Sequence, residues 1–304
     1  MLGCPMNAKR DQWADWLLDR RHGGDKEHFQ ELLPALEEFQ RRVIARATIA
    51  NGDIVLDVGT GDGLIAFAAL EKVGPAGRVI FSDVSQDLLD ECKALAQGLE
   101  VLDRCEFVRG SADALPFADE SVDVVTTRSV LIYLSDKASA FCEFHRVLKR
   151  GGRLSIFEPI NIFGFEERRT LYHGLDVRPV AHLADKIRAH WESPETHPLL
   201  SFDERDLLRF AEQAGFEEIE LDYRAEIGHE PWTKSWETFL RSSGNPLDPT
   251  PLEEMNSYLD PDERAEFQTY LRRLVEQHPS VPQRRAGAYM RAIKGKAPMR
   301  PQAG

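Results

Sequence analysis

The residues best suited to chemistry form a glycine-rich turn, Asp57-Val58-Gly59-Thr60-Gly61-Asp62-Gly63, which follows a short apolar run. Glycines at alternate positions let the backbone turn tightly and let a ligand approach main-chain atoms that a Cβ would block. The apolar periodicity of Leu64 to Val73 predicts a helix directly after the turn. The N-terminus of that helix then faces the ligand. This order of strand, turn and helix predicts a ligand-binding loop.

Two details of this turn separate one nucleotide cofactor from another. A dinucleotide fingerprint, GxGxxG, has its third glycine where this chain has Leu64. Asp57 stands two residues before the first glycine, and its carboxylate would repel a pyrophosphate. S-adenosylmethionine carries an ammonium and a sulfonium and no phosphate. Asp57 therefore favours that cofactor and disfavours a nicotinamide dehydrogenase.

Two further acids follow later apolar runs. Asp83 ends the second predicted strand, 24 residues after Gly59 (83 − 59), where doubly wound sheets place a carboxylate on the ribose hydroxyls. Its alternative role is to cap the helix predicted over 86–97, although Ser85 is better placed for that. Asp113 follows the third strand and is able to accept a hydrogen bond from an adenine amino group. The alternative role of Asp113 is that of a solvent-exposed acid in a turn.

The motif DVGTGDG stands in a series of blocks, FSDVS (81–85), GSADALPF (110–117), SVDVVTTRSVLIYL (121–134) and LKRGGRLSIFEP (148–159). Together they resemble a class I S-adenosylmethionine-dependent methyltransferase, of the broad ubiquinone/menaquinone-methyltransferase-like group that acts on small molecules. The resemblance is strong over 50–160 and looser over 200–227 and the last strand.

The resemblance implies an α/β fold, a Rossmann-like doubly wound seven-stranded sheet whose last strand is antiparallel. It also implies that residues at four places hold the cofactor. The methionine part lies against the glycine turn and the loop after the fourth strand, the ribose lies beside the second strand, and the adenine lies beside the third. The residues concerned are Asp57, Gly59, Thr60, Gly61, Gly63, Asp83, Val84, Asp113, Ala114, Arg128 and Ser129.

Alternating apolar runs and helical periodicities predict the elements that position these residues. Strands are expected at 54–56, 78–81, 105–108, 122–126 and 153–157, and helices at 64–73, 86–97 and 138–148. Such alternation favours a parallel sheet covered on both faces. We divide the chain into an N-terminal helical cap (1–50), a cofactor-binding core (51–159), a helical lid (160–200), a continuation of the core (201–227), a helical insertion (228–285), and the last strand with the tail (286–304).

The substrate is expected beyond the carboxyl ends of the fourth and fifth strands, under the lid and the insertion. We take Tyr133, Glu158 and His173 as candidate catalytic residues, with Tyr172 and His182 as further polar candidates. Each has a plainer role open to it: packing for Tyr133, a helix cap or ion pair for Glu158, and solvation for the histidines. A general base is needed only if the acceptor keeps a proton of high pKa.

Aromatic residues of the lid and insertion predict an apolar, aromatic or polyketide-like acceptor. They are Phe163, Phe165, Trp191, Trp232, Trp236 and Phe239. The same residues serve equally well as a dimer interface, so a homodimer stays open. Trp13 and Trp16 either close over the cofactor or belong to an N-terminal core stripe.

Composition narrows the partners. The 304 residues carry a net charge of −13, which argues against nucleic acid or membrane as a partner. No apolar run approaches the ~18 residues of a membrane span, and the four cysteines share no metal-binding spacing. We therefore expect a cytoplasmic enzyme with a small-molecule substrate and no metal. A non-methylating reaction that uses the same cofactor, or cofactor binding without turnover, stays open as an alternative.

Overall fold

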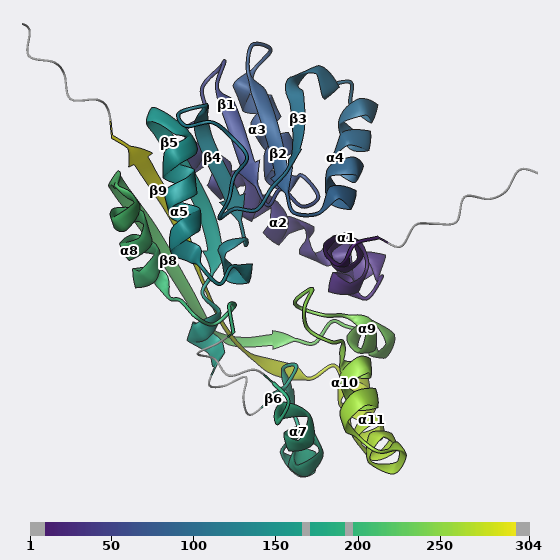
Figure 1. Ribbon diagram of the computed structural model, residues 1–304. Helices are drawn as coiled ribbons and strands as arrows, with labels where there is room; N and C mark the ends of the chain where they lie inside the picture. The colour runs from purple at the N-terminus through teal and green to yellow at the C-terminus, as the bar shows by residue number, and fades with distance from the viewer. Residues whose placement is uncertain (1–9, 166–170, 192–196, 296–304) are drawn as a thin grey trace, which may run out of the picture.

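The computed structural model describes residues 10–165, 171–191 and 197–295, and it is built around one seven-stranded sheet (Figure 1). The strand order is β3-β2-β1-β4-β5-β9-β8. β1 to β5 pair in parallel, whereas β9 is antiparallel to both β5 and β8. The strands are β1 (Ile54–Val58), β2 (Arg78–Asp83), β3 (Cys105–Arg109), β4 (Val122–Arg128), β5 (Leu148–Pro159), β8 (Phe216–Pro231) and β9 (Ser280–Lys294). The predicted doubly wound sheet with an antiparallel last strand is confirmed.

Helices cover both faces of this sheet. Val55 packs with one layer and its neighbour Leu56 with the other, as alternation along a strand requires. One layer contains α2 (Lys26–Ala47) and α3 (Leu64–Val73), and the other contains α5 (Lys137–Val147) and α8 (Glu204–Ala214). α4 (Gln86–Gly98) packs beside β2 and β3, and η2 (Leu102–Arg104) precedes β3. Burial on both faces explains why the strands read as continuous apolar runs.

The N-terminal segment consists of α1 (Gln12–Leu18), η1 (Arg20–His22) and the start of α2. Asp11 caps α1, and its carboxylate also accepts a 2.7 Å hydrogen bond from the hydroxyl of Ser85 in the core. Asp25 caps α2 and accepts a 2.6 Å hydrogen bond from the hydroxyl of Thr238 in the insertion. The segment predicted as an N-terminal cap therefore joins the core to the insertion.

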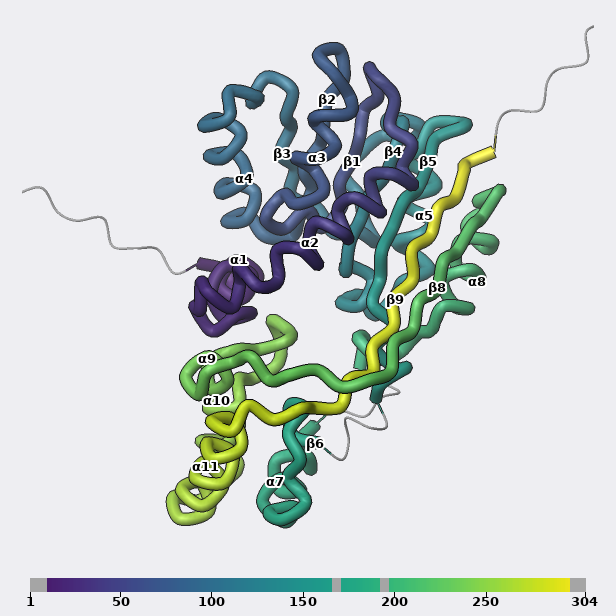
Figure 2. The backbone as a smooth tube through the Cα atoms, turned by 180° about the vertical axis from the view of Figure 1, so that it is seen from behind, coloured from purple at the N-terminus to yellow at the C-terminus, as the bar shows by residue number. Residues whose placement is uncertain are grey.

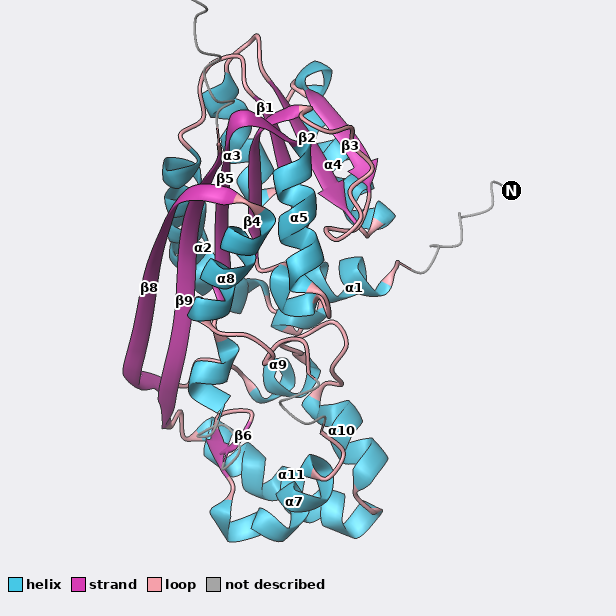
Figure 3. Cartoon of the chain, turned by 60° about the vertical axis from the view of Figure 1, so that its left-hand side comes forward, coloured by secondary structure: helices cyan, strands magenta, loops and turns pink. Residues whose placement is uncertain are grey.

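A second body packs around its own apolar cluster, which includes Tyr172, Phe239 and Phe267. We call this body the cap, and it is separate from the predicted N-terminal cap of residues 1–50. It comprises β6 (Leu171–Tyr172), β7 (Leu175–Asp176), η5 (Arg178–Val180), α7 (Ala181–Arg188), α9 (Trp236–Arg241), α10 (Pro251–Tyr258) and α11 (Pro261–Glu276). The prediction that 160–200 forms helices over the sheet is wrong in two respects. Its β6–β7 hairpin is not helical, and with α7 it packs against the insertion, below the sheet (Figures 1 and 3).

The β8–β9 hairpin is longer than predicted and connects the two bodies (Figure 2). Pairing begins at Phe216 with Lys294 in the core and continues to Pro231 with Ser280 beside the cap. The predicted insertion of 228–285 therefore shortens to 232–279, because its two ends are paired strand. Exposed, polar residues such as His229 and Glu230 give this part of the edge strand no apolar alternation, so its sequence did not predict a strand.

Candidate functional site

The glycine turn lies at the carboxyl end of β1 and has the backbone conformation that the sequence predicted. Gly59, Gly61 and Gly63 have φ values of +64°, +56° and +82°, all in the region that favours glycine. A Cβ on Gly59 would lie 2.2 Å from Cγ2 of Val130 in the loop after β4. Only a glycine therefore allows these two loops to approach each other, and their main chains bound the same cavity.

Two buried carboxylates face this cavity from β1 and β2. Asp57 is 2% exposed and accepts a 2.7 Å hydrogen bond from the Thr126 hydroxyl, while burial raises its pKa to about 7. Asp83 accepts 2.9 Å hydrogen bonds from the backbone N–H groups of Gly61 and Ser85, and burial raises its pKa as well. No ion pair to either is found within the described ranges. A positively charged ligand with hydroxyl groups would suit this pair.

Ser85, rather than Asp83, caps the helix after β2. Its hydroxyl accepts a 3.1 Å hydrogen bond from the N–H of Leu88 at the start of α4. This frees the Asp83 carboxylate to face the cavity, as the sequence suggested. Val84 also lines the cavity and is 38% exposed, an unusual exposure for valine that leaves an apolar surface beside Asp83.

The loop after β3 bounds the next part of the cavity through Gly110, Ser111 and Ala112. Asp113 and Ala114 are exposed and do not line the cavity, and the Asp113 carboxylate accepts a hydrogen bond from the Ser111 hydroxyl. These two predicted adenine residues therefore lie outside the cavity lining, directly after Ala112 in the chain.

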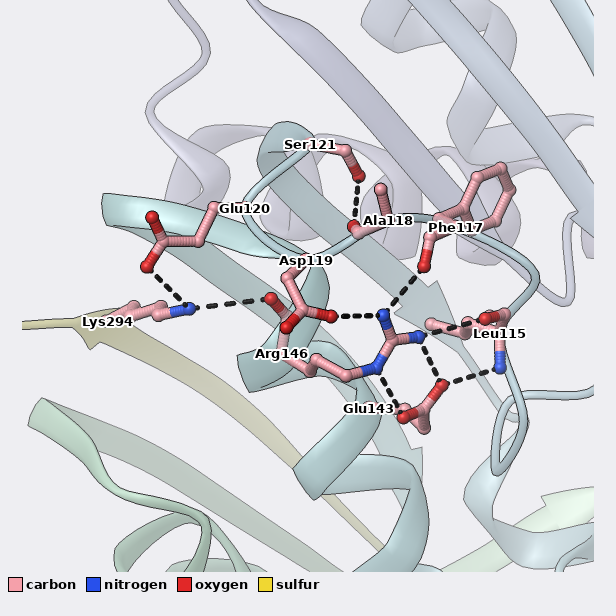
Figure 4. Close-up of polar contacts among 9 residues, drawn as sticks. All are labelled: Leu115, Phe117, Ala118, Asp119, Glu120, Ser121, Glu143, Arg146 and Lys294. Atoms are coloured by element: carbon pink, nitrogen blue, oxygen red, sulfur yellow. Dashed lines mark hydrogen bonds and ion pairs between the residues drawn. The ribbon is translucent and has the colours of Figure 1, made fainter.

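Arg146 on α5 holds the continuation of this loop in place (Figure 4). Its guanidinium donates to the carbonyl oxygens of Leu115 and Phe117 at 2.9 and 2.7 Å and pairs with Asp119 and Glu143. The Glu143 carboxylate in turn accepts from the Leu115 N–H at 2.8 Å. Arg146 therefore fixes the chain at Leu115 and Phe117, directly after the residues of this loop that line the cavity.

Arg128 and Ser129, at the end of β4, line the cavity as predicted for residues beside the cofactor. Burial, followed by the charge of Arg21, lowers the pKa of Arg128 to about 10. Its Nε is buried and has no hydrogen-bond partner within the described chain. Ser129 has a φ of +56°, a strained conformation for a serine. Such strain next to a ligand site is typical of functional loops.

Glu158 does not face the cavity, so its predicted catalytic role is corrected. The side chain is fully buried, and its carboxylate accepts hydrogen bonds from the backbone N–H groups of Val130, Leu131 and Ile132 at 2.9, 3.0 and 3.3 Å. These groups begin η3 (Leu131–Tyr133). Glu158 is therefore a positioning residue for the loop that carries Tyr133, which matches the capping role left open for it.

Core and cap together enclose one cavity of about 1270 Å³. On the core side, beyond the glycine turn, Trp13, Trp16 and Tyr133 line it. The rings of both tryptophans meet Tyr133 edge to face, at centroid distances of 5.1 and 6.2 Å. Burial raises the pKa of Tyr133 to about 12, so the phenol stays protonated near neutral pH. The indole N–H of Trp16 donates at 2.8 Å to the Ser243 carbonyl in the insertion, so Trp16 ties the two bodies together.

His173 reaches the cavity from the turn of the β6–β7 hairpin. Its Nε2 lies 2.8 Å from Oε2 of Glu254, whose carboxylate also accepts from the Tyr172 hydroxyl and the Trp191 indole at 2.8 and 2.9 Å. Although burial opposes ionisation, these three donors lower the pKa of Glu254. The ionised carboxylate only accepts, so Nε2 of His173 carries a proton. His173 also has a φ of +48°, a conformation that a histidine rarely adopts.

Other substrate-side predictions divide between the cavity and the interior. Phe165, Trp191, Trp232 and Phe239 line the cavity, whereas Trp236 packs into the cap and Phe163 against the core. His182 is exposed and outside the cavity, so its predicted role is corrected. The buried aromatics, which include Trp232 and Phe239, give no support to the dimer interface that the sequence left open.

Sequence reasoning missed several polar residues that line the cavity from the insertion. They are Lys234, Asn245, Asp248 and Glu254. Nothing in a single sequence marked them, since each stands in a charged, amphipathic stretch of no recognised motif. They line the same cavity because α9 and α10 come together in space.

Among the residues that the structure describes, no group of three or more His, Cys, Asp or Glu side chains is arranged to hold a metal ion. No helix within these ranges is long and apolar enough to cross a membrane.

Comparison with known proteins gives matches of two kinds. A family model described as a methyltransferase domain matches residues 56–156. The chain is 31% identical over 191 residues to the ubiquinone/menaquinone biosynthesis C-methyltransferase UbiE of Marinomonas sp. (strain MWYL1), covering 59% of this chain and 72% of the relative. It is 32% identical over 194 residues to the UbiE protein of Escherichia coli O1:K1 / APEC, covering 60% and 73%.

Solved structures with the same fold are more distant in sequence. The BH2331 protein of Bacillus halodurans C-125 has a TM-score of 0.52 and 21% identity, covering 85% of this chain and all of that chain. The [4+2]-cyclase SpnF has a TM-score of 0.50 and 18% identity, covering 86% and 82%. At these identities the structures share the fold, and no common reaction follows from them.

Proposed function

Because this chain belongs to the class I S-adenosylmethionine-dependent methyltransferases, we propose that it methylates an apolar, aromatic small molecule held between the core and the cap. The observation that carries this proposal is the single cavity, which is lined at one end by the glycine turn and the paired acids and at the other by the aromatic residues of the cap. Family membership favours methyl transfer over the non-methylating and non-catalytic alternatives.

The residues of the core fit the cofactor. The glycine turn would accept the methionine end, since Gly59 and Gly61 take positive φ values and line the cavity. Asp57 is a buried carboxylate with no cation beside it, and the ammonium and sulfonium of the cofactor would favour its charged form. We assign Asp83 and Val84 to the ribose and adjoining ring, and Arg128 and Ser129 to the methionine end. Asp113 and Ala114 are assigned to the adenine rim.

When bound, S-adenosylmethionine would supply a methyl group on a sulfonium, to be transferred by in-line attack of an acceptor atom on the methyl carbon as the C–S bond breaks and S-adenosylhomocysteine leaves. The chain's part is to hold the acceptor at attack distance, and such positioning contributes on the order of 7–11 kcal/mol. We propose that Trp13, Trp16 and Tyr133 hold an aromatic acceptor beside the glycine turn. The cap excludes water from the cavity, which strengthens the electrostatic interactions inside it.

The protonation state of the acceptor decides whether a base takes part. We propose that His173 contacts the substrate at the cap end of the cavity, with Glu254 fixing the orientation of its ring. An amine or thiolate acceptor needs no base, whereas a hydroxyl acceptor must lose a proton. The pH profile of the rate distinguishes these two classes of acceptor.

Two assays test the proposed function. Calorimetry should show that S-adenosylmethionine binds and NAD does not. Incubation with methyl-labelled cofactor and small-molecule extracts should then transfer label to a metabolite of apolar, aromatic character. Binding of NAD instead of S-adenosylmethionine would refute the assignment of the cofactor. Labelling of polar metabolites alone would refute the proposed class of acceptor.

We also propose a cytoplasmic location, which fractionation of the producing cells tests. The number of copies in solution is measured by light scattering, and a monomer would exclude the homodimer.

A further inference from the structure

The carboxylates that line the cavity already have hydrogen-bond donors. Each of them accepts from a neighbouring group or faces a histidine within 4 Å. The pairs are Asp57 with Thr126, Asp62 with the N–H of Leu64, Asp83 with the N–H of Gly61, Glu230 with Gln283, Asp248 with His197, and Glu254 with Tyr172. Each of these acids therefore has a partner within the described chain, and Asp57 and Asp83, which form no ion pair there, face the site assigned to the cationic cofactor.

Three cations of the same cavity are not matched by acids. Arg21, Arg128 and Lys234 line it, and none of them forms an ion pair within the described ranges. The Nζ of Lys234 donates only to the Ser242 hydroxyl, at 3.1 Å, and burial lowers its pKa. The guanidinium of Arg21 lies over the ring of Trp16, 5.1 Å from its centroid. Three cations that line one cavity without an ion-pair partner favour a ligand that carries an anionic group.

Arg21 and Lys234 are brought together where the N-terminal segment meets the insertion. The Ser243 N–H donates at 2.9 Å to the Arg20 carbonyl, next to Arg21 in the chain. The Thr238 hydroxyl donates to the Asp25 carboxylate, and these two residues stand four positions after Lys234 and Arg21, respectively. Burial, and then the charges of Arg21 and Lys234 among its neighbours, lower the pKa of His22 to about 4. The two cations are therefore close enough to act on a common neighbour.

The cofactor accounts for at most one of the three cations. S-adenosylmethionine has a single carboxylate, and Arg128 ends β4 and lines the cavity with the glycine turn that we assign to the methionine end. Arg21 and Lys234 then remain, on the side of the cavity that the N-terminal segment and the insertion form. The cavity is also lined by aromatic rings, namely Trp16, Tyr133, Trp232 and Phe239, and the Trp16 ring lies against Arg21.

We propose that the substrate is an aromatic carboxylate whose acidic group is held by Arg21 and Lys234. This inference rests on the proposed function and names the substrate class of the same site. The planar guanidinium of Arg21 is able to bind a carboxylate through two parallel hydrogen bonds, and the lysine ammonium adds a point charge. Their desolvation is then offset by the anion, while the ring packs against the aromatic wall.

Binding of a matched series of small probes to the enzyme saturated with S-adenosylhomocysteine tests this proposal. Calorimetry with benzoate, neutral benzamide and cationic benzylamine should show benzoate binding roughly tenfold more tightly than benzamide, and benzylamine most weakly. Added salt should weaken the binding of benzoate and leave the binding of benzamide unchanged. Equal affinity, a preference for benzylamine, or no detectable benzoate binding would overturn the proposal.

Variants locate the effect. Arg21→Gln and Lys234→Gln should each reduce the preference for benzoate by roughly tenfold, and Lys234→Arg should retain it. Arg241→Gln, an exposed cation of α9 outside this cavity, is the matched control and should change nothing. If both Gln variants keep the preference for benzoate and unfold thermally like the wild type, Arg21 and Lys234 do not bind the carboxylate. Failure of S-adenosylhomocysteine itself to bind would instead refute the proposed function and, with it, this inference.

Discussion

Replacing Glu158 by Gln should change how the stability of the protein depends on pH. Glu158 is fully buried against three backbone N–H groups at the start of η3, and burial raises its pKa from 4.5 to about 7. A carboxyl with a raised folded-state pKa contributes stability that is fully present below its unfolded pKa. That contribution is lost as the pH rises through the folded pKa. Gln does not ionise, so the variant escapes this loss.

The size of the effect follows from the two pKa values. Ionisation of Glu158 should lower the free energy of unfolding by roughly 3 kcal/mol once the pH is well above 7. Of this, about 2 kcal/mol falls between about pH 5.5 and pH 8. Relative to the wild type, Glu158→Gln should therefore gain about 2 kcal/mol over that interval. It begins at a disadvantage of roughly 1 kcal/mol, because the amide replaces one accepting oxygen with a donor.

Urea unfolding followed by tryptophan fluorescence, at several pH values across that interval, measures the difference directly. Glu143→Gln is the control, because its hydrogen bonds with Arg146 lower the pKa of Glu143. Its difference from the wild type should stay flat across that interval, since the contribution of Glu143 is fully present above its unfolded pKa and is lost only as the pH falls through its lowered folded pKa. A flat difference for Glu158→Gln, or one of reversed sign, would show that the carboxylate is already stabilised as an anion and would refute the reasoning.

Three other substitutions test the site. Gly59→Ala should weaken binding of S-adenosylmethionine more than tenfold. An alanine at this positive φ costs about 1–2 kcal/mol, and the clash of its Cβ with Val130 costs about 1–3 kcal/mol more. Gly98→Ala, where a Cβ meets nothing within 4 Å, should bind normally in calorimetry. Asp83→Asn should weaken the binding of S-adenosylmethionine by roughly tenfold. An unchanged Kd would exclude the proposed binding of the ribose by Asp83. Trp232→Ala should raise the substrate KM at constant cofactor Kd, whereas Trp236→Ala should lower the Tm of the cap. Equal KM effects in both would contradict the assigned cavity wall.

The sequence predicted the core well because its signals are local. Strand β1 and the turn after it are marked by adjacent residues, an apolar run and then Gly59, Gly61 and Gly63 with positive φ. The capping role of Ser85 follows from its own position before α4. Turn chemistry and capping act over a few residues, so one sequence is enough to find them.

The cap depends on contacts that no local pattern reports. The Trp16 indole meets the Ser243 carbonyl across 227 positions, and His173 meets Glu254 across 81. Glu158 shows the same difficulty at closer range. A strand-end carboxylate looks alike in the sequence whether it faces a ligand or turns inward to backbone N–H groups. Its orientation was decided by where η3 packs, which is a tertiary property.

The β8–β9 hairpin also sets the order in which the molecule is completed during synthesis. β9 inserts between β5 and β8, so the edge of β5 and one side of β8 stay unpaired until Ser280–Lys294 has left the ribosome. The same strand supplies Val281 to the apolar cluster of the cap. Neither body closes before the other on the nascent chain, because a single late segment finishes both.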